Sequence, residues 1–175
     1  MKLEIRKIAA AAIIGALYAV LTALLAPISY GPLQLRVSEA LCILPFFLPF
    51  TAWGLFFGCA IANIVGAAGI LDILFGSLAT LCAGLCTAAV GKRGEGLRRE
   101  FLACAMPVLW NSLIIGAVMT FTLTDRSPSS DPGAFALFAA QIGLGELGVM
   151  YLIALPLMRW LPKRKFFLEI VHKFS

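Results

Sequence analysis

Several polar side chains stand within or beside long apolar runs of the chain, where polar groups are rare. A carboxylate at the centre of a bilayer costs about 2.5–3.5 kcal/mol on insertion scales, so such residues usually face a cavity or a partner. We therefore expect the carboxylates and amides to converge on one outward-opening pocket. The alternative is hydrogen bonding between helices, with Arg36 and Glu39 forming a local pair three residues apart. The set comprises Arg36, Glu39, Asn63, Asp72, Asn111, Gln141 and Glu146.

The residue types of this set indicate what the pocket would bind. Carboxylates accept hydrogen bonds, whereas Asn and Gln both donate and accept them. Arg36 is the only basic side chain near the pocket, and a phosphate would need more lysine or arginine. The pattern favours a neutral or cationic solute rich in donors, such as a purine-like base. Aromatic residues that could stack on its ring, although membrane packing is the commoner role of any one of them, are Trp110, Tyr30, Phe75 and Trp53.

Catalytic chemistry is not indicated. The single histidine, His172, lies in the tail, so the chain offers no Ser–His, Cys–His or metal constellation. Cys82 and Cys86 share a helix face but have no histidine nearby. The glycines of residues 143–148 match a dinucleotide-binding pattern, yet close packing of membrane helices explains them without a cofactor. We expect no enzyme activity, no metal, no cofactor and no nucleotide-hydrolysing motif.

Membrane-spanning helices are the elements that must position these residues. The chain is 61% apolar and 13% charged, whereas soluble domains average about half apolar and a quarter charged. No polar linker is long enough to separate two domains, so we expect a single membrane domain over residues 1–175. The predicted fold is all-α, a compact bundle of six spans at residues 8–26, 38–50, 52–69, 72–91, 101–123 and 134–158.

The basic residues decide the number of spans. All but two of the 14 lysines and arginines fall before residue 8, between 92 and 99, or after 158. The uncharged stretch 40–69 is too long for one span and short for two. Two crossings bring all three basic clusters to the cytoplasm, as the positive-inside rule requires, whereas one crossing would violate it. We therefore predict cytoplasmic N and C termini and no nucleic-acid partner.

Small residues line one flank of the first span. Ala12 and Ala16 are four residues apart, with Gly15 and Ala19 beside them. Small residues let membrane helices approach closely, either within the bundle or at a docking face for a separate membrane subunit. The pattern alone leaves both interpretations open.

Three sequence runs carry a resemblance to a known family. They are APISYGPLQLRVSEAL at 26–41, GCAIAN at 58–63 and DILFGSLAT at 72–80, followed by Gly145 and Glu146. Together they resemble the QueT family of queuosine-precursor transporters, which are substrate-binding (S) components of energy-coupling factor (ECF) transporters. The resemblance covers most of the chain and is weakest in the fifth span and the tail.

The resemblance implies the fold and the partners of such an S component. It implies a six-helix bundle in the bacterial plasma membrane, an alanine motif at Ala12 and Ala16 that docks on a transmembrane coupling subunit, and two partner ATPases. Gly15 departs from the alanine expected there, without harm to the docking face. The implied substrate is the aminomethyl deazaguanine precursor of queuosine, with Glu39, Asp72 and Glu146 as candidates to bind its guanine-like edge and its amine.

Other functions fit parts of the same pattern. A self-sufficient, ion-coupled transporter would use Glu39, Asp72 or Glu146 as a proton site, and an S component for another vitamin would share the topology. Substrate binding and the need for partner ATPases distinguish these hypotheses.

Overall fold

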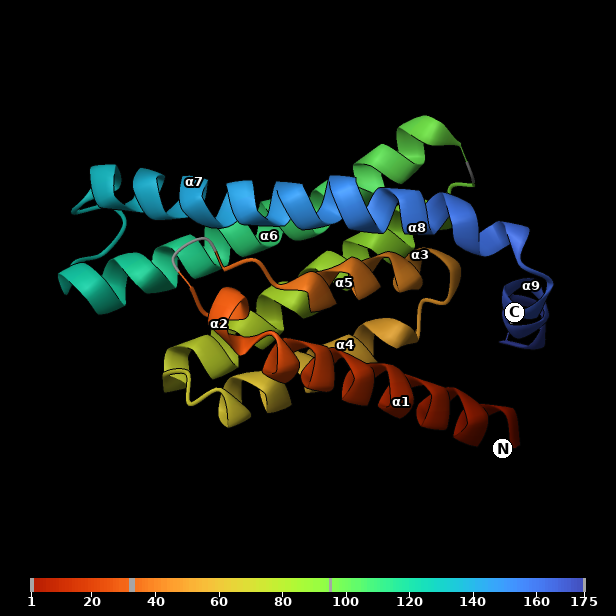
Figure 1. Cartoon of the computed structure of the whole chain (residues 1–175). Coiled ribbons are helices and arrows are strands. Elements are labelled where there is room, and N and C mark those ends of the chain that lie inside the picture. The colour runs from red at the N-terminus through yellow and green to blue at the C-terminus, as the bar shows by residue number, and fades with distance from the viewer. Residues whose placement is uncertain (1, 32–33, 95, 175) are drawn as a thin grey trace.

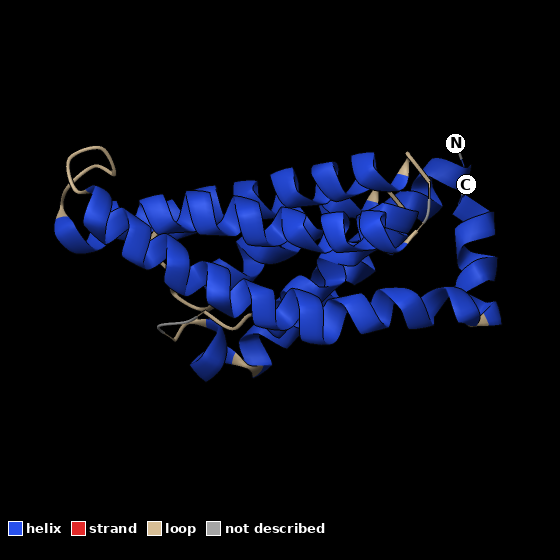
Figure 2. Ribbon diagram, turned by 90° about the horizontal axis from the view of Figure 1, so that it is seen from above, coloured by secondary structure: helices blue, strands red, loops and turns tan. Residues whose placement is uncertain are grey.

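A computed structural model describes residues 2–31, 34–94 and 96–174, and every regular element within these ranges is helical (Figure 2). Four helical stretches are long and apolar enough to cross a membrane, at Leu3–Leu24, Asp72–Gly91, Leu97–Thr124 and Pro132–Lys163. Two shorter apolar helices cover Val37–Phe47 and Thr51–Val65. The prediction of an all-α membrane protein is therefore confirmed.

The elements follow one another with short connections (Figure 1). The first half contains α1 (Lys2–Leu24), α2 (Ala26–Ser29), the 3₁₀ helix η1 (Val37–Ile43), α3 (Leu44–Phe47), α4 (Thr51–Val65), the π-helical turn η2 (Asp72–Gly76) and α5 (Ser77–Gly91). The second half contains α6 (Leu97–Thr124), α7 (Pro132–Gly148), the π-helical turn η3 (Val149–Ala154), α8 (Leu155–Trp160), the 3₁₀ turn η4 (Leu161–Lys163) and α9 (Lys165–Phe174).

The region predicted as the second span, 38–50, is not one regular α-helix. It begins as the 3₁₀ helix η1, continues as the four-residue α3, and ends before Pro49. Proline lacks a backbone donor and fixes its own φ angle, so Pro45 is tolerated in the first turn of α3 while Pro49 stops the helix. The third helix is also shorter than the predicted 52–69, because α4 ends at Val65 and Gly66 follows as its cap.

Glycines allow two helix pairs to pack with their backbones in contact. A Cβ added to Gly54 would collide with the carbonyl of Ala11, and one added to Gly58 would collide with the carbonyl of Gly15. A Cβ at Gly116 would stand 2.9 Å from the Cα of Ala139. The pairs α1–α4 and α6–α7 therefore pack by the small-residue mode of membrane helices.

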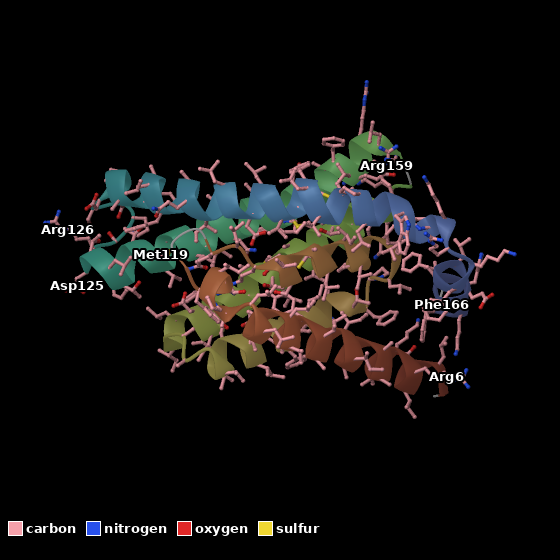
Figure 3. The ribbon with its side chains drawn as sticks, viewed as in Figure 1. Arg6, Met119, Asp125, Arg126, Arg159 and Phe166 are labelled. Carbon is pink, nitrogen blue, oxygen red and sulfur yellow. The ribbon has the colours of Figure 1, made fainter. Side chains whose placement is uncertain are left out.

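The chain ends lie at the same end of the bundle. The start of α1, the end of α5, the start of α6 and the helix α9 are all found there, whereas the turn between α6 and α7 lies at the opposite end (Figure 1). The side chains follow the same division, with Arg6 and Phe166 at one end and Arg126 at the other (Figure 3). The regions of the three basic clusters thus share one end.

Helix α9 lies across this end of the bundle rather than along the long helices (Figure 2). The buried ring of Phe167 meets Phe47 edge-on with ring centroids 5.2 Å apart, and Phe174 lies 5.4 Å from Phe50. One apolar face of α9 thus covers the ends of α3 and α4, while Phe166 on another face remains exposed.

Candidate functional site

The 3₁₀ helix η1 carries the first part of the candidate site into the middle of the bundle. Its residues Ser38, Glu39, Ala40, Cys42 and Ile43 are all buried. Ala40 and Ile43 join an apolar cluster with residues of η3, which fixes one face of the segment. The other face presents polar groups to α1 and α5.

Glu39 is the centre of a hydrogen-bonded cluster drawn from three elements. The hydroxyl of Tyr18 on α1 donates to Glu39 Oε1, and Thr80 on α5 lies 3.5 Å from the same oxygen. Within η1, the thiol of Cys42 donates to Glu39 Oε2 at 3.0 Å. Both carboxylate oxygens therefore have donors, as a side chain that is 1% exposed requires.

A second contact ties η1 to the same turn of α1. Thr22 Oγ1 lies 2.6 Å from Ser38 Oγ and also donates to the backbone carbonyl of Tyr18 at 2.9 Å. The α1–η1 contact is therefore polar at both Glu39 and Ser38.

Arg36 lies just before η1 and is also buried. Its Nη1 lies 3.8 Å from the sulfur of Cys59, and its guanidinium carbon stands 5.4 Å from the centre of the Tyr30 ring. Among the described residues, Arg36 forms no ion pair with Glu39, and its buried Nε has no hydrogen-bond partner. The local Arg36–Glu39 ion pair considered above is therefore not formed.

Tyr30 closes over the end of α4. Its hydroxyl donates to the carbonyl of Ala62 at 2.6 Å, and Gly66 is the residue that leaves room for its ring. Partial burial raises the pKa of Tyr30, so the hydroxyl stays protonated and remains a donor. Tyr30 thus connects the segment before Arg36 to α4.

Asn63 links α4 to η2. Its Nδ2 donates to the backbone carbonyl of Asp72 at 2.9 Å and lies 3.7 Å from the sulfur of Cys59, the atom that Arg36 also approaches. In the described part of the chain, the buried Asn63 Oδ1 has no partner. Gly76 allows this approach, since a Cβ there would stand 3.0 Å from Asn63 Nδ2.

Asn111 and Glu146 form the third part of the site, between α6 and α7. Asn111 Nδ2 donates to Glu146 Oε1 at 2.7 Å, and both residues are buried. Glu146 Oε2 is buried without a hydrogen-bond partner among the residues described. Gly143, one turn earlier on α7, lies so near Ser112 that an added Cβ would be 2.8 Å from its hydroxyl.

Packing contacts connect these three parts. Gly76 lies between Asn63 and Ile115, and Ile115 is one turn after Asn111 on α6. Gly148, two residues after Glu146, faces the side chain of Leu35, the neighbour of Arg36. Arg36, Asn63 and Glu146 therefore line adjoining parts of one buried polar region.

Three other predicted residues lie differently. Asp72 starts η2 and is half-buried, and its backbone carbonyl rather than its carboxylate meets Asn63. Trp110 is half-buried and turns its indole N–H toward Cys86 on α5, at 3.4 Å, rather than toward the buried polar region. Gln141 is half-buried on α7, five residues before Glu146.

Sequence reasoning missed the hydroxyl and thiol groups of the region. Those whose contacts are described above are Tyr18, Thr22, Ser38, Cys42, Cys59 and Thr80. Such residues are common in membrane helices, so their presence carries little signal. The four-residue spacing of Tyr18 and Thr22 on α1 could have indicated a shared polar face.

The small residues of α1 divide between two roles. Gly15 is buried against Gly54 and Gly58 of α4, and Ala19 packs beside an apolar cluster that contains Tyr18. Ala12 and Ala16 are exposed and line an apolar surface groove of about 500 Å³ between α1 and α4. The groove continues along α4 past Trp53, Gly54 and Phe57.

The described residues contain no group of three or more His, Cys, Asp or Glu side chains arranged to hold a metal ion. The polar region combines carboxylates, amides, hydroxyls, thiols and one guanidinium.

Comparison with known proteins yields one family and one relative of note. A sequence profile described as QueT transporter matches residues 8–163. A protein of Lactococcus lactis subsp. cremoris (strain MG1363), named queuosine precursor transporter QueT, is 42% identical over 72 residues. That alignment covers 40% of this chain and 42% of the relative, so it spans less than half of each protein. No solved structure matches the chain.

Proposed function

The chain belongs to the QueT transporter family, and from that premise we propose that it is the substrate-binding membrane subunit of an ECF-type importer. In this role it captures a queuosine precursor, the aminomethyl deazaguanine base, outside the cell. A separate coupling subunit and two ATPases then drive uptake. The name of the L. lactis relative and the donor-rich solute favoured by the polar residues support this choice of substrate.

The observation that carries the proposal is a set of unpartnered polar atoms within the buried region. Arg36 Nε, Asn63 Oδ1 and Glu146 Oε2 are buried and lack hydrogen-bond partners among the described residues. Burying a polar group without a partner costs free energy, and native structures rarely keep such groups without a functional reason. One donor and two acceptors in adjoining positions match a planar base that carries N–H groups beside a ring carbonyl.

The arrangement of the chain ends supports a topology of six crossings. An even number of crossings returns the C terminus to the side of the N terminus, and both ends of the described chain lie at one end of the bundle (Figure 1). The short helices η1–α3 and α4 then serve as the second and third crossings. With the basic ends in the cytoplasm, the turn between α6 and α7 faces outward.

The groove between α1 and α4 supports docking on a coupling subunit. Exposed Ala12 and Ala16 leave the backbone of α1 open to a partner helix, and small residues of this kind favour close helix association. Gly15 serves the α1–α4 contact instead, so the docking face consists of the two alanines and the adjoining surface of α4.

Ligand titration tests the substrate assignment. Purified protein in detergent is titrated calorimetrically with the aminomethyl deazaguanine base and, in parallel, with riboflavin, thiamine and biotin. We expect saturable binding of the base alone. Binding of another vitamin with no binding of the base at micromolar concentration would show that the substrate assignment is wrong.

A docking variant tests the partner assignment. Ala16→Trp fills the groove from an exposed position, so we expect it to abolish co-purification with the coupling subunit and ATPases while substrate binding persists. Leu24→Trp is the matched control, because Leu24 is also exposed on α1 but lies outside the groove.

Uptake of the base by vesicles that contain this chain alone would instead support a self-sufficient, ion-coupled transporter.

A further inference from the structure

Among the residues that the structure describes, the buried carboxylates Glu39 and Glu146 differ in their hydrogen bonding. Glu39 receives donors on both oxygens, from Tyr18, Cys42 and Thr80. Glu146 receives one donor, Asn111 Nδ2, on Oε1, and its Oε2 has no partner in the described ranges. Both residues are at most 3% exposed, so both carboxylates lie inside the bundle.

This difference bears on which carboxylate meets a ligand. Both oxygens of Glu39 already have donors, so a ligand contact there would add to acceptors that are already satisfied. A contact at Glu146 would supply a hydrogen bond that the buried Oε2 lacks. The energetic gain on binding is therefore larger at Glu146.

Asn111 prepares Glu146 for this role. By donating to Oε1 at 2.7 Å, it fixes the carboxylate from the α6 side. Each carboxylate oxygen accepts more than one hydrogen bond, so Oε1 retains capacity beside the free Oε2. The pair thus presents two acceptor atoms in a fixed plane, which suits two adjacent N–H donors.

We propose, on the basis of the function proposed above, that Glu146 is the carboxylate that accepts the two adjacent N–H donors of the guanine-like edge. Asn111 is a positioning residue that orients Glu146. Glu39 is a structural residue that holds η1 against α1 and α5 and does not touch the ligand. The unpartnered Arg36 Nε is the donor available to the ring carbonyl beside those N–H groups.

A binding cycle between protein variants and ligand analogues tests this assignment. Purified wild type and Glu146→Gln are titrated with two ligands. One is the aminomethyl deazaguanine base, and the other is its analogue that lacks the amino group of the guanine-like edge but keeps the aminomethyl group. In wild type we expect the analogue to bind about 100-fold more weakly, because the buried acceptor of Glu146 is then left without its donor. In Glu146→Gln we expect weak binding of both ligands, with a difference below about 5-fold, because the acceptor that distinguishes them is changed.

Three further variants test whether Asn111 orients Glu146 and whether Glu39 stabilises the fold without contacting the ligand. Asn111→Ala should reduce the discrimination between the two ligands without removing it. Glu39→Gln should lower the unfolding temperature while the ligands remain discriminated as in wild type. Glu169→Gln, an exposed carboxylate on α9, is the control that changes neither property.

The outcomes distinguish this inference from the function on which it rests. If wild type does not bind the base, the proposed function fails and the assignment fails with it. If wild type binds but Glu146→Gln still discriminates about 100-fold, the assignment alone is overturned. Loss of discrimination in Glu39→Gln would also overturn it, and if that variant does not fold, the cycle at Glu146 and Asn111 decides the question.

Discussion

At Glu39, side chains from α1, η1 and α5 meet within the apolar bundle. Removing one donor from such a group leaves a buried acceptor less satisfied, and the cost is then the desolvation of that acceptor rather than the net value of one bond. Thr80 donates to Glu39 from 3.5 Å, so Tyr18 and Cys42 make the closer contacts. The hydroxyl of Tyr18 is the group whose loss we expect to matter most.

Tyr18→Phe keeps the buried ring and removes only this hydroxyl. We expect a loss of about 1–3 kcal/mol in the free energy of unfolding, because Glu39 Oε1 loses its nearest donor. The measurement is an unfolding titration with SDS in mixed micelles.

Tyr151→Phe is the control for this substitution. Its hydroxyl donates to the carbonyl of Phe101 at 3.0 Å in an exposed setting, so a change below about 1 kcal/mol is expected. Equal effects of the two variants would contradict the role assigned to Tyr18 and Glu39.

Between elements, small residues bring the backbones of α1 and α4 into contact. Gly54 and Gly58 are one turn apart on α4, and they face Ala11 and Gly15 on α1. The same contact determines which small residues of α1 remain available to a partner. Close packing uses Gly15, and Ala12 and Ala16 are left on the surface.

Gly54→Ala should disturb this helix pair. The new methyl group would collide with the backbone carbonyl of Ala11, so α1 and α4 must separate, at an expected cost of about 1–3 kcal/mol. Unfolding in mixed micelles measures the change in stability.

Gly133→Ala is the matched control for Gly54→Ala. Gly133 lies in the exposed first turn of α7, where an added Cβ would meet only Asp131 Oδ1, at 3.8 Å. We expect no loss of stability there, since alanine favours the helix. A Gly54 variant as stable as the Gly133 variant would show that α1 and α4 are not in backbone contact.

For the whole molecule, the distribution of charge and the arrangement of the ends agree. Helix α9 and the start of α1 share one end of the bundle, and the turn that contains Asp125 and Arg126 forms the other (Figures 1 and 3). A membrane orientation with the basic end inside accounts for both features.

Cysteine labelling in intact cells tests the orientation. Ser129→Cys, in the exposed turn between α6 and α7, should react with a membrane-impermeant maleimide added outside. Lys92→Cys, exposed at the end of α5, should react only after permeabilisation. The unsubstituted chain, whose own cysteines are buried or half-buried, gives the background. Labelling of the Lys92 variant in intact cells would reverse the predicted topology.

Much of the element structure follows from local sequence. A helical stretch occupies Asp72–Gly91, the range predicted for the fourth span. Helix α6 extends over the fifth predicted span, and the continuous stretch formed by α7, η3 and α8 extends over the sixth. Long apolar runs with charged residues at their ends are enough to predict where these helices lie. The second predicted span is less regular, because Pro45 and Pro49 restrict the backbone in a way that hydropathy alone does not describe.

The sequence by itself determined that this chain is an all-α membrane protein with rare polar groups in its apolar stretches, because hydropathy and charge are properties of consecutive residues. Only the tertiary structure decided that Glu39 is fully hydrogen-bonded while Glu146 keeps an unpartnered oxygen. Their partners lie 21 and 35 residues away at Tyr18 and Asn111. No periodicity encodes such pairings, since they depend on which helix faces meet when the bundle packs.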